Sequence, residues 1–270
     1  MHTDLPDPAI LALVQEHTGP VSELRCTAGG FSSDLTALVG CEKGAFFVKA
    51  VRNRPGGRRD SLIREWLVNA SVRSLSPPLL WDAEDDGWVV LGFEAVEGRD
   101  ADFAPGSLDL PLVVDAVARV GRLPLPEVAR DWRETRWDRF ARDRFEAELF
   151  QGDSLLHTDV NPSNFLVGER EVWVVDWSWP TRGAGFLDPA LLAVQLIASG
   201  HAPASAEGWV ARCPAWQRAD PVAIGAFAGA NSLMGEAFLA RKPDVGWLKA
   251  MAEACRAWAG HRGGGVEQGG

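Results

Sequence analysis

Short apolar runs fill the first third of the chain and are separated by turns rich in glycine, serine and proline. The runs are rich in β-branched and aromatic residues, and they predict five strands, at residues 21–27, 35–39, 45–51, 77–81 and 88–93. Apolar positions recur at helical spacing in residues 61–68, and residues 8–14 resemble a short helix before the first strand. The order along the chain is therefore three strands, a helix and two strands.

Beyond Gly98 the spacing of apolar positions becomes mostly helical. Helices are expected through much of residues 110–150 and again at 189–198 and 221–239. Acidic and basic residues alternate along residues 131–149, which favours a solvated helix face with i,i+4 ion pairs. The aromatic and apolar residues of this segment would form the buried side of that helix: Trp132, Trp137, Phe140, Phe145 and Leu149. The glycine-rich tail from about residue 263 is expected to be disordered.

Composition narrows the class of protein. A chain of 270 residues with 46% hydrophobic content can bury a large core, and no apolar run is long enough to predict a membrane span. The net charge of -10 argues against a nucleic-acid partner and is compatible with a cationic substrate. The four cysteines are scattered, which is typical of free thiols in a reducing compartment, and no signal peptide is expected at the start.

The most specific polar pattern lies at residues 157–176. His157, Asp159 and Asn164 form an H-x-D-x-x-x-x-N sequence, and Asp176 ends a β-branched run. Phosphoryl transfer needs a carboxylate that orients the attacking hydroxyl, and it needs oxygen ligands for the Mg²⁺ that neutralises the phosphates. Asp159 suits the first task, and Asn164 and Asp176 suit the second. Turn chemistry at residues 161–164 is the local alternative, but the strand-ending aspartate favours the catalytic interpretation.

This combination resembles the aminoglycoside phosphotransferase family, which shares the protein-kinase fold and includes choline and homoserine kinases. The family's H-x-D-x-x-x-x-N motif is matched by the three residues named above. The kinase Asp-Phe-Gly motif is matched at Asp176, where Trp177 and Ser178 replace Phe and Gly. The resemblance covers residues 21–196. His157 is expected to shape the loop, and Asp188 is expected either to brace it or to cap the helix that Pro189 begins.

The resemblance implies an α+β, bilobal protein-kinase-like fold. Residues 1–95 would form a small N-lobe with an antiparallel sheet that binds the nucleotide. Residues 96–270 would form a larger, mostly helical C-lobe with the catalytic loop and the substrate-binding helices.

Lys49 ends the apolar run at residues 45–48. A buried ammonium needs an anionic partner because its desolvation is costly, and either a phosphate or a carboxylate would serve. Glu65 on the next helix is the natural carboxylate, and the pair resembles the strand lysine and helix glutamate of kinases. The alternatives are an edge-strand lysine in solvent and a Glu65 that pairs with Arg64.

Two further segments are candidates for nucleotide binding. Between the first two strands, small residues would let backbone N–H groups approach phosphates closely: Gly29, Gly30, Ser32 and Ser33. Taken alone this segment is better explained as a hairpin turn, and its position before the lysine strand favours the phosphate-binding interpretation. By analogy with the family, the hinge follows the fifth strand, where the carbonyl of Glu94 and the N–H of Val96 would bond adenine.

These residues and the family resemblance together predict a kinase that uses ATP and Mg²⁺ to phosphorylate a hydroxyl of a small molecule. The net charge favours a cationic acceptor, and the resemblance implies an aminoglycoside or another antibiotic. The pattern does not distinguish ATP from GTP. The alternatives are a kinase for choline, homoserine or a sugar, and a silent, kinase-shaped nucleotide-binding protein. A metal-dependent hydrolase built on Asp159, Asp176 and His157 would need further ligands at metal spacing, which the sequence lacks. We expect a cytoplasmic monomer or weak dimer.

Overall fold

The computed structural model describes residues 7–27, 33–169 and 171–264. The chain forms two compact units. Unit 1 consists of Met1–Gly98 together with Trp173–Trp179, and unit 2 consists of Arg99–Val172 and Pro180–Gly270. The segment that contains Asp176 therefore packs within unit 1. A division of the chain at residue 95 would assign this segment to the C-lobe.

Unit 1 is built on a five-stranded antiparallel sheet with the strand order β1-β2-β3-β5-β4. The strands and helices predicted for this part of the sequence are all present. Their bounds are α1 Pro8–Thr18, β1 Val21–Cys26, β2 Leu35–Cys41, β3 Gly44–Arg52, α2 Gly57–Val72, β4 Leu79–Glu84 and β5 Trp88–Glu94.

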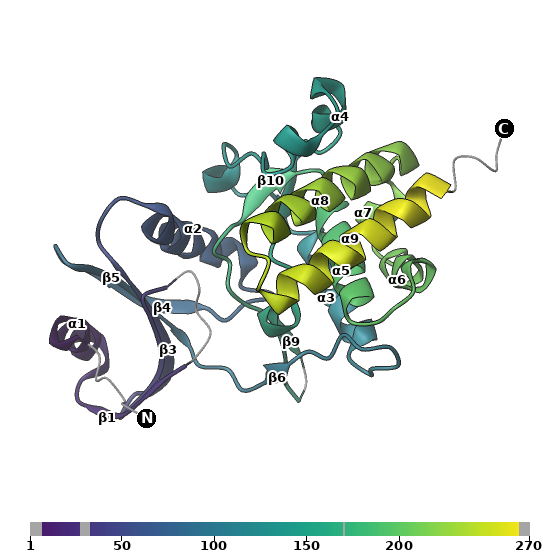
Figure 1. Ribbon diagram of the computed structural model, residues 1–270. Coiled ribbons are helices and arrows are strands. Elements are labelled where there is room, and N and C mark those ends of the chain that lie inside the picture. The colour runs from purple at the N-terminus through teal and green to yellow at the C-terminus, as the bar shows by residue number, and fades with distance from the viewer. Residues whose placement is uncertain (1–6, 28–32, 170, 265–270) are drawn as a thin grey trace. The chain divides into compact units, whose positions relative to one another are not determined.

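Alternation along the central strand β3 sends its side chains to two different cores. Val48 and Ala50 pack in the cluster that includes α1, whereas Phe47 and Val51 pack in the cluster that includes α2. The two helices thus cover opposite faces of the sheet (Figure 1). Because side chains in a strand alternate with a period of two, Lys49 lies on the face that α2 covers.

Unit 2 is mostly helical, as its apolar spacing predicts. Its elements are β6 Arg99–Asp100, α3 Leu110–Val120, α4 Arg144–Glu148, β7 Ser154–Leu156, β8 Phe165–Val167, β10 Thr181–Gly183, α5 Leu187–Ala198, α6 Pro203–Val210, α7 Pro214–Gln217, α8 Pro221–Arg241 and α9 Gly246–Gly264, with 3-10 turns at Glu127–Ala129, Asp138–Phe140 and Pro162–Asn164. Strand β9 (Val172–Val174) leads from unit 2 into unit 1. Strands β7 and β10 pair antiparallel, and so do β6 and β8. Helix α9 reaches Gly264, so the start of the glycine-rich tail is helical, and the rest of that tail lies outside the described residues.

An aromatic cluster around Phe227 of α8 forms a major part of the core of unit 2. Its ring centroid lies 4.9 Å from that of Trp137, 5.6 Å from Phe150, 6.0 Å from Phe186 and 6.4 Å from Trp258 of α9. Helices α8 and α9 lie side by side in Figure 1. The cluster therefore joins this helical pair to the segments that precede and follow the predicted catalytic loop.

The prediction of a helix at residues 131–149 is wrong. This segment contains a 3-10 turn and only the five-residue helix α4, and Phe145 is 65% exposed instead of buried. Glu134 is buried, and its carboxylate accepts hydrogen bonds from the backbone N–H and the guanidinium of Arg136 and from the hydroxyl of Thr181. These contacts hold the backbone in a turn at Glu134. Tertiary bonding outweighs the charge pattern that favoured a helix.

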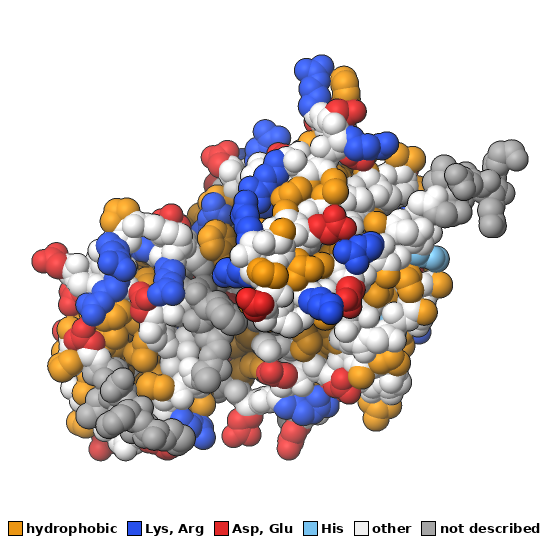
Figure 2. Space-filling view, in the orientation of Figure 1, with side chains coloured by type: hydrophobic (Ala, Val, Ile, Leu, Met, Phe, Trp, Pro, Cys, Tyr) orange, Lys and Arg blue, Asp and Glu red, His pale blue; other side chains and the backbone are white. Residues whose placement is uncertain are grey.

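By length and composition alone, α8 could cross a membrane, although no span was expected from the sequence. Of its most apolar window, 44% is buried inside the unit, and its buried side packs in the core described above. Figure 2 shows hydrophobic and charged side chains mixed over the surface of α8 and α9. The core helix of a soluble protein passes the same test, so this finding is weak support for a membrane span.

Candidate active site

Three charged side chains from distant parts of the sequence meet in unit 1. Nζ of Lys49 lies 2.8 Å from Oε1 and 2.9 Å from Oε2 of Glu65, and 2.7 Å from Oδ1 of Asp176. Lys49 and Glu65 are 7% and 5% exposed, and the side chain of Asp176 is 27% exposed. Strand β3 and helix α2 position the first two, and the turn after β9 positions the third. Lys49 is thus not an edge-strand lysine in solvent, and Glu65 binds it directly.

Burial alone would lower the pKa of Lys49, because it disfavours the charged ammonium. The charges of Glu65 and Asp176, and the hydrogen bonds to both, outweigh this effect and raise the pKa above its ordinary value. Lys49 therefore stays protonated at neutral pH. Its ammonium is a fixed positive charge that donates a hydrogen bond to Asp176, whose carboxylate is partly exposed.

Asp176 lies in a strained turn. Its φ of 60° is in the left-handed region, which a non-glycine residue adopts at a cost unless its surroundings hold it there. Trp177, in the place of the kinase phenylalanine, is 1% exposed, and its Nε1 donates to the carbonyl of Val174 at 3.2 Å. Ser178, in the place of the kinase glycine, is 2% exposed, and its hydroxyl donates to Oδ1 of Asp176. Both replacements therefore hold the turn.

The predicted catalytic loop lies in unit 2 and follows β7. The carboxylate of Asp159 accepts hydrogen bonds from the side-chain amides of Asn161 at 3.1 Å and Asn164 at 3.0 Å. Nδ2 of Asn164 also donates to the carbonyl of Asp159 at 2.8 Å. Asp159 is half-buried, and Asn164 is buried. The loop therefore fixes one carboxylate through two amides and leaves it partly accessible, as a base for an incoming hydroxyl requires.

A buried carboxylate holds the start of this loop. Oδ2 of Asp188 accepts the N–H of His157 at 2.8 Å, and Oδ1 accepts the N–H of Thr158 at 2.9 Å. Thr158 has a φ of 64°, also in the left-handed region. Burial raises the pKa of Asp188, although His157 and the two N–H groups oppose this shift. Of the two roles expected for Asp188, the bracing contact is present, whereas the N-cap position of α5 is occupied by Phe186.

His157 shapes the same loop. Its ring is 1% exposed, and its Nδ1 accepts the N–H of Asp159 at 3.3 Å. The ring thus reaches the backbone of the candidate base rather than its carboxylate.

The available oxygen donors suit a hard divalent cation. The carboxylate of Asp176 already faces one cation, the Lys49 ammonium. Asn164 uses its amide nitrogen toward Asp159, so its oxygen is the atom that it can offer to a metal. Mg²⁺ is usually held by one or two protein ligands together with substrate phosphates. Within the described residues no cluster of three or more His, Cys, Asp or Glu side chains could hold a metal. Asp176 in unit 1 and Asn164 in unit 2 each offer an oxygen of the type that Mg²⁺ prefers.

The other predicted nucleotide contacts are only partly visible. Gly29, Gly30 and Ser32 lie outside the described residues, and Ser33, which follows them, is buried. Glu94 ends β5, and its N–H donates to the carbonyl of Pro78 at 2.9 Å. Val96 is half-buried after the end of β5. Their roles in adenine binding stay predictions.

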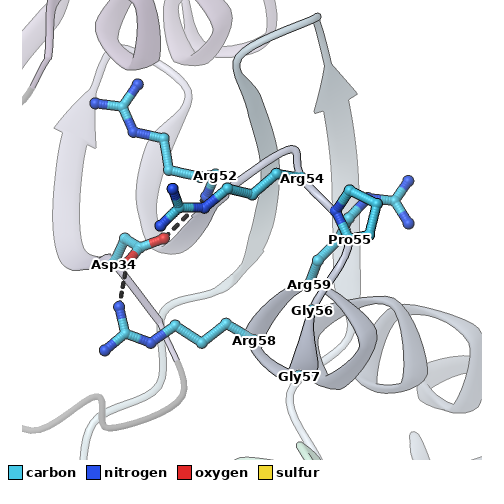
Figure 3. Close-up of a pocket in the computed structure, with 8 residues that line it drawn as sticks. All are labelled: Asp34, Arg52, Arg54, Pro55, Gly56, Gly57, Arg58 and Arg59. Carbon is cyan, nitrogen blue, oxygen red and sulfur yellow. Dashed lines mark hydrogen bonds and ion pairs between the residues drawn. The ribbon is translucent and has the colours of Figure 1, made fainter.

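An open pocket of about 260 Å³ lies at the start of α2 (Figure 3). It is lined by Asp34, Arg52, Arg54, Pro55, Gly56, Gly57, Arg58 and Arg59. Asp34 accepts the N–H of Arg52 at 2.9 Å and pairs with Arg58, and Arg59 pairs with Glu84. The pocket contains none of the predicted catalytic residues. Its ion pairs tie the start of β2 to α2.

Two contacts at the site are not among those predicted from the sequence. The hydroxyl of Ser178 bonds Asp176, and the side-chain amide of Asn161 bonds Asp159. The spacing of two residues between each of them and the aspartate that it contacts is the signal that was available, because Ser and Asn side chains often bond close to their own position in the chain.

No profile of a known protein family matches the sequence. No curated protein matches it either. Solved structures do match, over nearly the whole chain. An aminoglycoside phosphotransferase from Alicyclobacillus acidocaldarius has a TM-score of 0.64 at 15% identity, with coverage of 99% of this chain and 98% of its own. A choline kinase from Streptococcus pneumoniae has a TM-score of 0.61 at 12% identity, with coverage of 93% and 99%.

A third similar structure is an amicoumacin kinase in complex with AMP-PNP and Ca²⁺. Its TM-score is 0.60 at 10% identity, with coverage of 95% of this chain and 94% of its own. At such identities the likeness establishes the fold. The α+β, bilobal kinase-like fold expected from the sequence is confirmed, and the resemblance to aminoglycoside phosphotransferases holds at the level of the fold.

Proposed function

We propose that this protein is an ATP-dependent kinase that transfers the γ-phosphate to a hydroxyl of a small molecule. The observation that carries the proposal is the fixed set of charges in unit 1, where buried Lys49 binds both Glu65 and Asp176. The loop of unit 2 adds a carboxylate, Asp159, that two amides orient. The similar solved structures include phosphotransferases that act on small molecules, which supports the same class of reaction here.

Each group has a task in this reaction. Asp159 accepts the proton of the acceptor hydroxyl and orients it for in-line attack on the γ-phosphorus. Lys49 binds phosphate oxygens, and Glu65 keeps its ammonium in place. Asn164 and Asp176 would supply oxygen ligands to Mg²⁺, and the bound metal would neutralise charge on the phosphates. His157 and Asp188 hold the loop that carries the base. The complex of the amicoumacin kinase with AMP-PNP and Ca²⁺ supports the need for a nucleotide and a divalent cation.

The nucleotide contacts are proposed from the sequence. Backbone N–H groups of Gly29, Gly30, Ser32 and Ser33 would approach the phosphates. The carbonyl of Glu94 and the N–H of Val96 would bond adenine.

The acceptor is proposed to be cationic, with an aminoglycoside or another basic antibiotic as the leading class. The net charge of -10 supports a cationic ligand through long-range attraction. A metabolite such as choline, homoserine or a sugar is the second candidate, supported by the similarity to a choline kinase. We place the protein in the cytoplasm, acting as a monomer or weak dimer and without a nucleic-acid or membrane partner.

The test is ATP consumption by the full chain with Mg²⁺ and a panel of aminoglycosides, other basic antibiotics, choline, homoserine and neutral sugars. Asp159→Asn should lower kcat by roughly 100-fold or more and largely spare nucleotide binding, because the base acts in the transition state. Asp153→Asn is the matched control, because its side chain is 89% exposed in the same unit. Turnover in Asp159→Asn that equals the wild type would contradict the assignment. Nucleotide binding without any turnover would favour a silent kinase-shaped protein.

A further inference from the structure

The hydroxyl of Ser178 is directed at the candidate metal ligand. Ser178 is 2% exposed and donates to Oδ1 of Asp176, two residues earlier. The same oxygen accepts a hydrogen bond from Nζ of Lys49 at 2.7 Å. One carboxylate oxygen is therefore held by two donors, of which one is charged and one is neutral.

The two donors differ in what they can do when a nucleotide binds. In the proposed reaction the ammonium of Lys49 is needed at the phosphates, and a positive charge beside Asp176 would repel a divalent cation. A hydroxyl carries no net charge, so it can keep its hydrogen bond while the carboxylate binds a metal. Carboxylates that bind metals are commonly held by such outer hydrogen bonds, which fix the orientation of the ligand.

The backbone makes this support necessary. Asp176 has a φ of 60°, and such a conformation persists only where neighbouring contacts over-determine it. The hydrogen bond from Ser178 closes a short ring across the turn and opposes rotation of the carboxylate. Glycine, which occupies this place in the kinase Asp-Phe-Gly motif, has no side chain that could form such a bond.

We propose that Ser178 is a positioning residue that fixes the carboxylate of Asp176 for Mg²⁺ binding, and that holds Oδ1 when Lys49 binds the nucleotide phosphates. The inference rests on the proposed function, because it assumes that Asp176 binds the nucleotide's metal. It adds a specific role for a residue outside the catalytic set described above.

Ser178→Ala removes the donor with little change in volume. The measurement is binding of AMP-PNP to the full chain by calorimetry, at a series of Mg²⁺ concentrations and in EDTA. In the wild type, Mg²⁺ should raise the affinity for AMP-PNP, and half of this gain is reached at a characteristic Mg²⁺ concentration. We expect Ser178→Ala to raise that concentration by about 10–100-fold, because this is the usual effect of removing an outer hydrogen bond from a metal ligand. The affinity for AMP-PNP in EDTA should not change. Ser178→Cys keeps a weak donor and should give a smaller rise, and it provides the same test if Ser178→Ala does not fold.

Ser61→Ala is the matched control in the same unit. Ser61 is 1% exposed, and its hydroxyl has no hydrogen-bond partner within the described part of the chain. Its removal should leave the metal dependence unchanged. The inference would be overturned if Ser178→Ala and the wild type had the same metal dependence. It would also be overturned if Ser178→Ala lost the same affinity for AMP-PNP with and without Mg²⁺, because this would show that Ser178 contributes only to packing. If wild-type binding of AMP-PNP did not depend on Mg²⁺, the proposed function itself would fail.

Discussion

Replacement of Asp188 tests whether one buried carboxylate holds the catalytic loop. Its two oxygens accept the backbone N–H groups of His157 at 2.8 Å and Thr158 at 2.9 Å, and all three residues are buried. Asp188→Ala removes both acceptors and leaves two donors in a dry environment. Asp188→Asn keeps one acceptor oxygen and turns its amide toward the other N–H group.

The size of the effect follows from these contacts. A buried donor left without a partner costs about 1–3 kcal/mol, so two of them would cost about 2–6 kcal/mol in Asp188→Ala. Relief from burying a charge offsets part of this, because burial raises the pKa of Asp188 and thus opposes its ionised form. We expect a loss of unfolding free energy of about 2–4 kcal/mol for Asp188→Ala and about 1–2 kcal/mol for Asp188→Asn.

The assay is urea unfolding of each variant, combined with kcat and the KM for ATP. Because Thr158 has a φ of 64°, loss of its bond should let the loop relax, so kcat should fall more than KM rises. Asp153→Ala, at an exposed site, should change the unfolding free energy by less than about 0.5 kcal/mol. The bracing role would be refuted if Asp188→Ala had a normal kcat and an unfolding free energy within about 0.5 kcal/mol of the wild type.

Three further outcomes are expected. Asp176→Ala should abolish the Mg²⁺ dependence of nucleotide binding in calorimetry, because it removes a preferred hard oxygen ligand; unchanged metal dependence would argue against this role. Lys49→Met should lower the unfolding free energy by about 3–5 kcal/mol in urea, because Glu65 is left buried without its cation, and Lys49→Met/Glu65→Leu should recover part of the loss. For Glu134, burial opposes ionisation, but the hydrogen bonds and charge of Arg136 outweigh it and lower the pKa. The ionised Glu134 therefore stabilises the fold above pH 4.5, its ordinary pKa, and this contribution is lost as the pH falls below that value. The free energy of unfolding of Glu134→Gln should thus depend less on acid pH than that of the wild type. An equal dependence would show that Glu134 does not cause the acid sensitivity.

The sequence determined the elements of unit 1 and the position of the predicted catalytic loop. Strands such as β3 are specified by short runs of β-branched and aromatic residues, which act within a few positions of each other. The bond between Asp159 and Asn164 joins two residues of the motif that are only five positions apart in the chain. Local signals suffice where the interacting groups are neighbours in the chain.

Residues 131–149 show where local signals fail. Their charges and aromatic residues recur at helical spacing, but Glu134 bonds Thr181, and Nε1 of Trp137 bonds Asn231 at 2.9 Å. Asn231 lies 94 positions from Trp137, so this bond cannot be predicted from the spacing of residues within the segment. Burial of Glu134 with its hydrogen-bond partners overrode the small preferences of i,i+4 pairs.

Only the tertiary structure decided which charged groups of the site meet. The sequence supplied Lys49 and Glu65 as candidates, and the packing of α2 on one face of the sheet brought them into contact. Lys49 reaches Asp176 across 127 positions of the chain, and Asp188 reaches the catalytic loop across 30. Such contacts depend on how helices and strands pack, because burial of apolar faces fixes the distances between residues that are remote in sequence.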